Sequence, residues 1–262
     1  MNSNFSTAFQ VFYKLLQRDW YTYRQAYPHR LKMALDWVLL VTLVSKLFMP
    51  ALGLKDYGAF ILITSAISYG LFIAMQNAIA MVDDITSHQA ILYELSLPIP
   101  QWAIFLKYAF SNMLQALLIM IGIMPFGMCV LMDIHAFPDF SCWKFIMIFL
   151  IAAIFYGAFS LIFSTILKNL YQIDNVWLRL IFPMWYLGGW QFSWKTLYNV
   201  SPTLAYLDFC NPMLFVFEAA KHATIDISGT LPFGFCCCMI LFYAAIFGTL
   251  GICWMKKRLD CL

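Results

Sequence analysis

The chain has 262 residues, of which 63% are hydrophobic and 11% are charged, and its mean hydropathy is +0.77. Soluble globular proteins are about 45–50% apolar and about 25% charged, because a water-soluble surface needs polar groups. The composition therefore excludes a soluble enzyme, a disordered chain and a secreted disulfide scaffold, and it indicates a membrane protein. The net charge of +3 is too small, and the basic residues are too scattered, for a nucleic-acid binder.

Residues 1–30 are predicted to form an amphipathic helix that lies in the membrane interface and ends or kinks at Pro28. Arg18 and Arg24 fall away from its apolar stripe and suit anionic lipid, whereas aromatic rings suit the headgroup layer. Packing of this helix against another subunit is the alternative. The stripe recurs every three or four positions, which is one face of a 3.6-residue period: Phe5, Phe9, Phe12, Leu16, Trp20, Tyr23 and Tyr27.

Long apolar runs predict about six membrane-spanning helices, since a span needs about 20 apolar residues. The fold class is therefore all-α, in a single transmembrane domain covering 1–262. Basic residues concentrate before the first run and after the last, so both termini are expected in the cytoplasm, which requires an even number of spans. The expected spans are 33–54, 57–82, 104–132, 144–167, 176–194 and 231–255.

The segment 84–98 is predicted to form a short amphipathic helix on the cytoplasmic side. Asp84, Thr86 or Ser87 is placed to cap it, and Pro98 ends it. Such a helix can seat in the groove of a partner protein. The alternative is an ordinary loop helix lying on the membrane.

The fifth expected span is irregular, because Pro183 removes a backbone donor and Gly188 and Gly189 weaken the helix. After it, Ser201-Pro202 and Asn211-Pro212 each mark a helix start. We therefore expect 195–222 to form a short re-entrant helical hairpin in the outer leaflet, between the fifth and sixth spans. An aromatic belt at the interface is the alternative for the rings gathered here: Trp185, Tyr186, Trp190, Phe192, Trp194, Tyr198 and Tyr206.

The reactive side chains form no evident catalytic or metal-binding set. The histidines are scattered over both sides, and Cys236, Cys237 and Cys238 point in different directions around a helix. Within the membrane, Asp36 and Lys46 are either functional charges or residues that reach the interface from the ends of the span.

Five motifs follow one another over nearly the whole chain: Arg18-Asp19-Trp20 in the first helix, Glu94-Leu95-Ser96-Leu97-Pro98-Ile99, Leu187-Gly188-Gly189, the segment from Asn211-Pro212 to Glu218-Ala219-Ala220-Lys221, and the basic tail Lys256-Lys257-Arg258. Their order resembles that in the permease subunit of type-2 ABC exporters. Many family members carry Glu-Glu-Gly upstream of the Ser-x-Pro turn, where this chain has Ser87-His88-Gln89.

The resemblance implies two permease subunits, this chain with a second copy or a homologue, above a dimer of cytoplasmic ATPases in a bacterial inner membrane. ATP and Mg²⁺ would bind to the ATPases, since this chain has no GxxxxGK[ST] loop, and the chain would be a transport subunit without catalysis of its own. The residues implied for ATPase coupling are Asp84, Glu94, Leu95, Ser96, Leu97 and Pro98. Those implied for the translocation path or outer gate are Trp185, Tyr186, Trp190, Phe192, Tyr198, Asn211, Pro212 and Glu218.

The cargo is expected to be amphiphilic, with a polysaccharide, lipid-linked glycan or lipid favoured and a drug or antibiotic as the alternative. Aromatic rings suit all of these. Glu218 is expected either at the outer gate or paired with Lys221 at i, i+3. A different class, an integral-membrane lipid or glycan transferase, would need clustered acidic or histidine residues at one face, and an ion-coupled transporter would need mid-span charges or an internal repeat.

Overall fold

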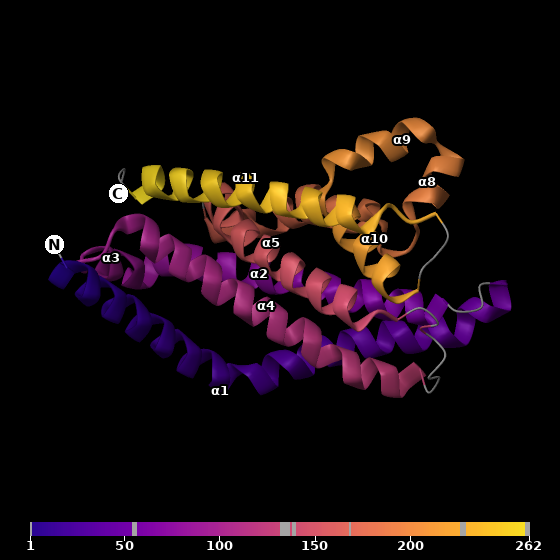
Figure 1. Ribbon diagram of the computed structural model, residues 1–262, viewed down its shortest axis with the longest axis horizontal. Coiled ribbons are helices and arrows are strands. Elements are labelled where there is room, and N and C mark those ends of the chain that lie inside the picture. The colour runs from indigo at the N-terminus through magenta and orange to yellow at the C-terminus, as the bar shows by residue number, and fades with distance from the viewer. Residues whose placement is uncertain are drawn as a thin grey trace.

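The structure is a computed structural model that describes residues 2–53, 57–131, 137, 140–167, 169–225 and 229–259. Within these ranges the chain is helical throughout and contains no strand (Figure 1). Five helices are long and apolar enough to cross a membrane, so the predicted multi-pass, all-α architecture is confirmed at this level. They are α1 (Asn2–Phe48), α2 (Tyr57–Asp83), α4 (Gln101–Leu131), α5 (Cys142–Ile166) and α11 (Phe233–Leu259).

The predicted interfacial helix and first span are one continuous helix, α1, which contains Pro28. A proline inside a helix removes one hydrogen bond and bends the axis, and Figure 1 shows α1 changing direction along its length. Tyr23 and Tyr27 donate to the backbone carbonyls of Gln115 and Leu118 in α4, over 3.2 and 3.4 Å. The expectation that Tyr23 faces the headgroup layer is therefore wrong, because its ring packs between two helices.

The fifth expected span, 176–194, is not among the five long helices. After the 3₁₀ turn η4 (Leu170–Gln172), the chain runs as a short, irregular series of turns. Gly189 stands at its end with a φ of +96°, where a residue with a side chain would be strained. The series consists of α6 (Ile173–Val176), the π turn η5 (Trp177–Ile181), α7 (Phe182–Trp185) and the π turn η6 (Tyr186–Trp190).

Both ends of the described chain lie at the same end of the bundle, together with α3 (Ala90–Leu95), while α8 (Trp194–Val200) and α9 (Pro202–Leu207) lie at the opposite end (Figure 1). The irregular series from Ile173 lies between α5 and α8 and is not one of the five long helices. A topology of six passes stays a prediction. The side of the membrane that each end faces stays a prediction.

The segment expected to be re-entrant folds as separate short helices. The 3₁₀ turn η7 (Asp208–Cys210) follows α9, and α10 (Pro212–Thr224) is buried on every side except at His222. Asn211 caps α10 as expected, because its Oδ1 accepts from the amide of Met213 at 3.1 Å. Short helices thus follow both predicted starts, and their depth in a membrane stays a prediction.

The helix α2 forms the centre of the bundle, packed against α1, α4, α5 and α10. The outer helices α1 and α11 instead expose large apolar side chains, among them Leu40, Leu47, Phe242 and Trp254. Soluble monomers rarely expose such faces, which suit contact with lipid or with another membrane helix.

Candidate functional site

Four charged side chains meet where α1, α3 and α4 come together, and we call them the charge cluster: Arg18, Asp19, Glu94 and Lys107. Lys107 Nζ lies 2.8 Å from Glu94 Oε2 and 3.0 Å from Asp19 Oδ2. Arg18 pairs with Asp19 at 2.9 Å and also with Glu94. The two positive and two negative charges balance, and Glu94 and Lys107 have no exposed surface. The charge cluster therefore joins three helices, through a fully buried Glu94–Lys107 pair and through pairs to the partly exposed Arg18 and Asp19 of α1.

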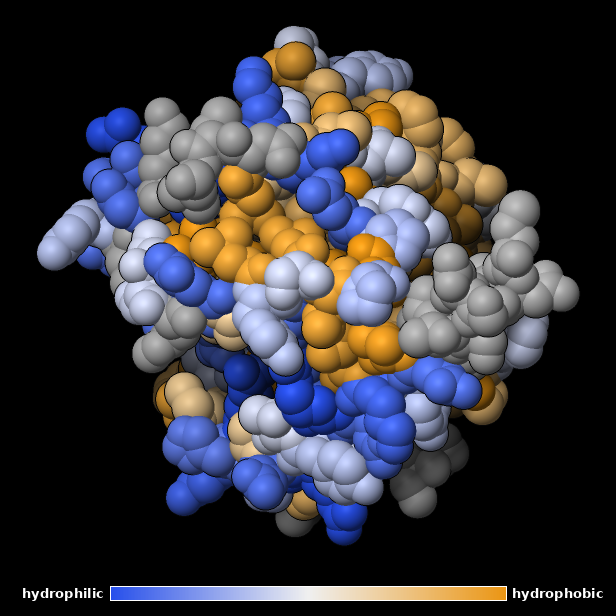
Figure 2. Space-filling model, turned by 90° about the vertical axis from the view of Figure 1, so that its left-hand side faces the viewer, coloured by the Kyte–Doolittle hydropathy of each residue, from blue (hydrophilic) through white to orange (hydrophobic). Residues whose placement is uncertain are grey.

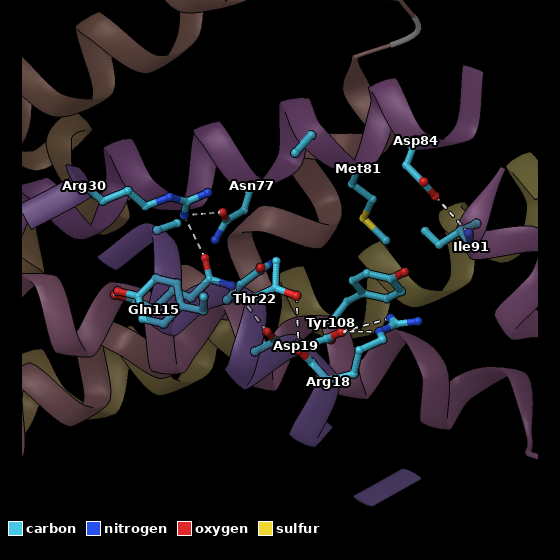
Figure 3. A pocket seen from close by; sticks show the side chains of 15 residues that line it. Arg18, Asp19, Thr22, Arg30, Asn77, Met81, Asp84, Ile91, Tyr108 and Gln115 are labelled. Atoms are coloured by element: carbon cyan, nitrogen blue, oxygen red, sulfur yellow. Dashed lines mark hydrogen bonds and ion pairs between the residues drawn. The ribbon is translucent and has the colours of Figure 1, made fainter. Parts of the chain in front are cut away.

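The local sequence explains how Glu94 reaches this point. A π turn, η2 (Asp84–His88), follows α2, and Gln89 then adopts a left-handed conformation that redirects the chain into α3. The Asp84 carboxylate accepts from the amides of Ala90 and Ile91 at 3.3 and 2.8 Å, as Figure 3 shows for Ile91. Asp84 thus satisfies the first amides of α3, one of the capping roles that the sequence predicts.

The geometry corrects the expectation that Glu94 meets a partner protein. The Glu94 carboxylate has no exposed surface and already pairs with two cations of the same chain, so a docking subunit cannot contact it directly. Leu95 and Leu97 are half-buried, whereas Ser96 and Pro98 are exposed. The sequence alone does not distinguish these positions, because each of them lies in the same short amphipathic segment.

Two large aromatic residues that sequence reasoning missed are exposed at this end. Tyr93 on α3 is 67% exposed, and Trp102 in the first turn of α4 is 58% exposed. Figure 2 shows this end of the molecule, where many hydrophilic side chains surround a central hydrophobic area. Tyr93 follows the buried Ile91 by two positions in α3. Residues two apart lie on different faces of a helix, so this spacing in the sequence could have predicted that Tyr93 is exposed.

At the other end of the bundle, Glu218 and Lys221 form the predicted i, i+3 ion pair at 3.1 Å, with both side chains fully buried. Lys221 Nζ also donates to the carbonyls of Gly189 and Phe192 at 2.9 and 2.6 Å. The Glu218 carboxylate accepts from the amide of Trp194 at 3.0 Å. Burial lowers the pKa of Lys221, and the Glu218 charge opposes that shift. The pair thus holds the residues at and just after the end of η6, from Gly189 to Trp194, against α10.

The residues implied for the translocation path divide into a buried and an exposed group. The rings of Trp185 and Trp190 lie 4.2 Å apart, and Trp37 of α1 stacks on Trp190. Trp190 Nε1 donates to Ser65 Oγ at 2.9 Å. Both Trp185 and Trp190 are buried, so within one chain they pack between helices and do not line an open path.

The remaining path residues lie nearer the surface. Tyr186 and Tyr198 are partly exposed, and Tyr198 packs with Trp194 of α8. Phe192 is half-buried and contributes its carbonyl to Lys221. Asn211 Nδ2 donates to the carbonyl of Met184 at 2.9 Å, which ties the start of α10, at Pro212, to α7.

The other charges singled out in the sequence have distinct surroundings. Lys46 Nζ donates to the carbonyls of Val130 and Leu131, so it caps the last turn of α4. Asp36 is exposed on α1. Of the residues implied for interfacial binding, Arg18, Trp20 and Arg24 are exposed.

In the part of the chain that the structure describes, no group of three or more His, Cys, Asp or Glu residues is placed to hold a metal ion. Comparison of the chain with models of protein families, with curated proteins and with solved structures gives no match. The functional argument therefore rests on the geometry and on the sequence motifs.

Proposed function

We propose that the chain is the membrane-spanning permease subunit of an ATP-driven exporter. It pairs with a second copy, and a separate cytoplasmic ATPase dimer binds ATP and Mg²⁺. One observation carries the proposal: α3 is joined to two long helices by the charge cluster, whose Glu94–Lys107 pair is fully buried, while Tyr93 on α3 and Trp102 at the start of α4 remain exposed. A short helix that is fixed on one side and exposes an aromatic residue on the other, followed by a second exposed aromatic residue at the start of the next helix, is suited to receive a partner.

We call the exposed residues Tyr93 and Trp102 the docking surface. The charge cluster connects this surface mechanically to two helices that cross the membrane. Removing one partner of a buried ion pair costs about 3–5 kcal/mol, so α3 cannot move far from α4 without a large penalty. The pair with the half-exposed Arg18 adds a weaker link from α3 to α1. A push on α3 from a closing ATPase dimer is then passed to Arg18 on α1 and to Lys107 on α4. Both helices run along most of the bundle, and their movement would open or close a path between two permease subunits.

The cargo proposed is an amphiphile, with a polysaccharide, lipid-linked glycan or lipid ahead of a drug or antibiotic. The aromatic rings at the end of the bundle opposite α3 support this class, since Trp194, Tyr198 and Tyr206 form a contiguous cluster there. Aromatic faces pack on sugar rings and on apolar molecules alike. Transport assays in vesicles with a labelled lipid-linked glycan and with a cationic drug, run in parallel, separate the two cargo classes.

The test of the proposal is capture of the ATPase followed by disruption of the docking surface. The tagged full-length chain is purified from its native membrane, and we expect an ATPase with a phosphate-binding loop to copurify. The double variant Tyr93→Ala, Trp102→Ala should lose at least 10-fold of the captured ATPase. Tyr206→Ala is the matched control, because Tyr206 is 56% exposed but lies on α9, at the opposite end of the bundle. Undiminished capture by the double variant, or no ATPase with the wild type, contradicts the proposal.

A further inference from the structure

A second feature of the same end of the bundle is a cavity of about 360 Å³ enclosed mainly by α1, α2 and α4. Its lining ranges from the exposed Arg18 and Thr22 to the buried Asn77, so it is accessible from the surface. Figure 3 shows Arg30, Asn77 and Gln115 gathered at one end of the cavity and Asp84 at the other. The volume lies within the range of small-molecule sites.

The charge on Arg30 has no counter-ion in the described part of the chain. Arg30 Nη1 donates to Asn77 Oδ1 at 3.1 Å and to Gln115 Oε1 at 2.8 Å, and both acceptors are neutral amides. The ion pairs found among the described residues do not include Arg30. A half-buried cation that has hydrogen bonds but no opposite charge is costly, and an anion placed beside it removes that cost.

Asn77 carries a second polar group in this region that lacks a partner. Its side chain is 9% exposed, and its Nδ2 is buried without a hydrogen-bond partner. The bond from Arg30 identifies Oδ1 as the acceptor, so the amide cannot be turned to exchange its nitrogen and oxygen. A buried N–H donor is therefore left unpaired on a residue that lines the cavity, next to a cation that has hydrogen bonds and an aromatic contact with Tyr23 but no counter-ion among the described residues.

The acidic residues of the cavity do not supply the missing partner. Asp19 is engaged by Arg18 and Lys107 in the charge cluster, and Asp84 accepts from the amides at the start of α3. The unsatisfied groups are thus donors and positive charge. These groups would be satisfied by a ligand whose oxygen atoms carry negative charge and accept several hydrogen bonds. A phosphate group has both properties.

We propose that this cavity binds the phosphate group of an anionic ligand, with Arg30 as its counter-ion and Asn77 Nδ2 as a hydrogen-bond donor. The phosphate belongs either to the headgroup of a membrane lipid or to a solute. This inference does not depend on the transport function. It predicts a site in the single chain that binds a phosphate-bearing molecule with or without an ATPase partner.

The experiment measures the apparent unfolding temperature of the full chain, purified in neutral detergent, by tryptophan fluorescence at constant ionic strength. The probes are phosphatidylglycerol, inorganic phosphate and, as a phosphate-free control, diacylglycerol. We expect the wild type to gain about 5 °C with a saturating phosphate-bearing probe and nothing with diacylglycerol. Stabilisation by phosphatidylglycerol alone supports a lipid headgroup, and stabilisation by inorganic phosphate as well supports a solute.

Asn77→Asp is the decisive variant. It keeps the acceptor for Arg30, replaces the unpaired donor with an oxygen and adds a counter-ion within the chain, so it should fold and lose the gain from phosphate. Arg30→Gln should lose the gain too, and Arg24→Gln, an exposed arginine on the same helix outside the cavity, should keep it. No gain in the wild type, or an equal gain in Asn77→Asp, overturns the proposal.

Discussion

Lys107 Nζ lies 2.8 Å from Glu94 Oε2, and neither side chain has any exposed surface. This pair joins a short helix, α3, to a long one, α4, across a separation of 13 residues. Arg18 and Asp19 of α1 complete the charge cluster. A buried pair of this kind is costly to break, because the partner that remains is a charge without compensation.

Replacing Glu94 with Leu is expected to destabilise the protein by about 3–5 kcal/mol, because Lys107 would keep only Asp19 as a partner. Adding Lys107→Met to the same chain should recover a large part of this loss, since no buried cation would then remain at that position. Thermal unfolding in detergent measures both variants, and Lys14→Met, at an exposed position on α1, is the control. A double variant no more stable than the single one would contradict this account.

Two glycines in long helices should respond differently to the same change. A Cβ at Gly157 would lie 2.4 Å from the carbonyl oxygen of Ala109, so Gly157→Ala must push α5 away from α4. A Cβ at Gly248 would lie 3.6 Å from Ala158, an ordinary contact. We expect Gly157→Ala to cost about 2 kcal/mol or more and Gly248→Ala to be neutral or stabilising. Unfolding temperatures decide this, and equal values for the two variants would be inconsistent with the helix spacing described.

The carboxyl group of Asp208 predicts a pH dependence. Burial raises its pKa from the ordinary 3.8 to about 6, and the bond donated by Asn211 opposes the shift. Its Oδ2 is buried without a hydrogen-bond partner. Between these two pKa values the folded chain binds more protons than the unfolded chain, so this group lowers the stability as pH rises from about 4 to 6.

The variant Asp208→Asn removes the titration and keeps an oxygen acceptor for Asn211. Its unfolding temperature relative to wild type should therefore be higher at pH 7.5 than at pH 4.5. Using the difference between the two proteins cancels other groups that titrate in this range. An identical difference at the two pH values would mean that Asp208 carries an ordinary pKa.

The proposed topology of six passes predicts that both termini face one side of the membrane. Cysteine-directed or protease-accessible tags at residue 1 and residue 262 should therefore react together in right-side-out vesicles or be protected together. The loop between α8 and α9, at Ser201, should show the opposite reactivity, because it lies at the other end of the bundle. Opposite behaviour of the two terminal tags would rule out the proposed topology.

Much of the local structure could be predicted from residues that are close in the chain. Apolar runs of sufficient length predict the long helices, Asn211-Pro212 predicts the start of α10, and Asp84 serves as one of the expected caps for α3. The Glu218–Lys221 pair also follows from local spacing, because residues three apart share one face of a helix. These features depend on one or two helical turns, so the order of the amino acids determines them without knowledge of the fold.

Only the tertiary structure decided which charged and aromatic residues are available for function. Glu94 looks like a docking residue in the sequence and is buried, because its partners come from residues 18 and 107. Tyr23 has the spacing of an interfacial anchor and packs against α4. The cavity lined by Arg30, Asn77 and Gln115 could not be predicted from the sequence, since these residues lie on three different helices. Helix packing brings such groups together over distances in sequence at which periodicity carries no information, and burial then determines which charges need a partner.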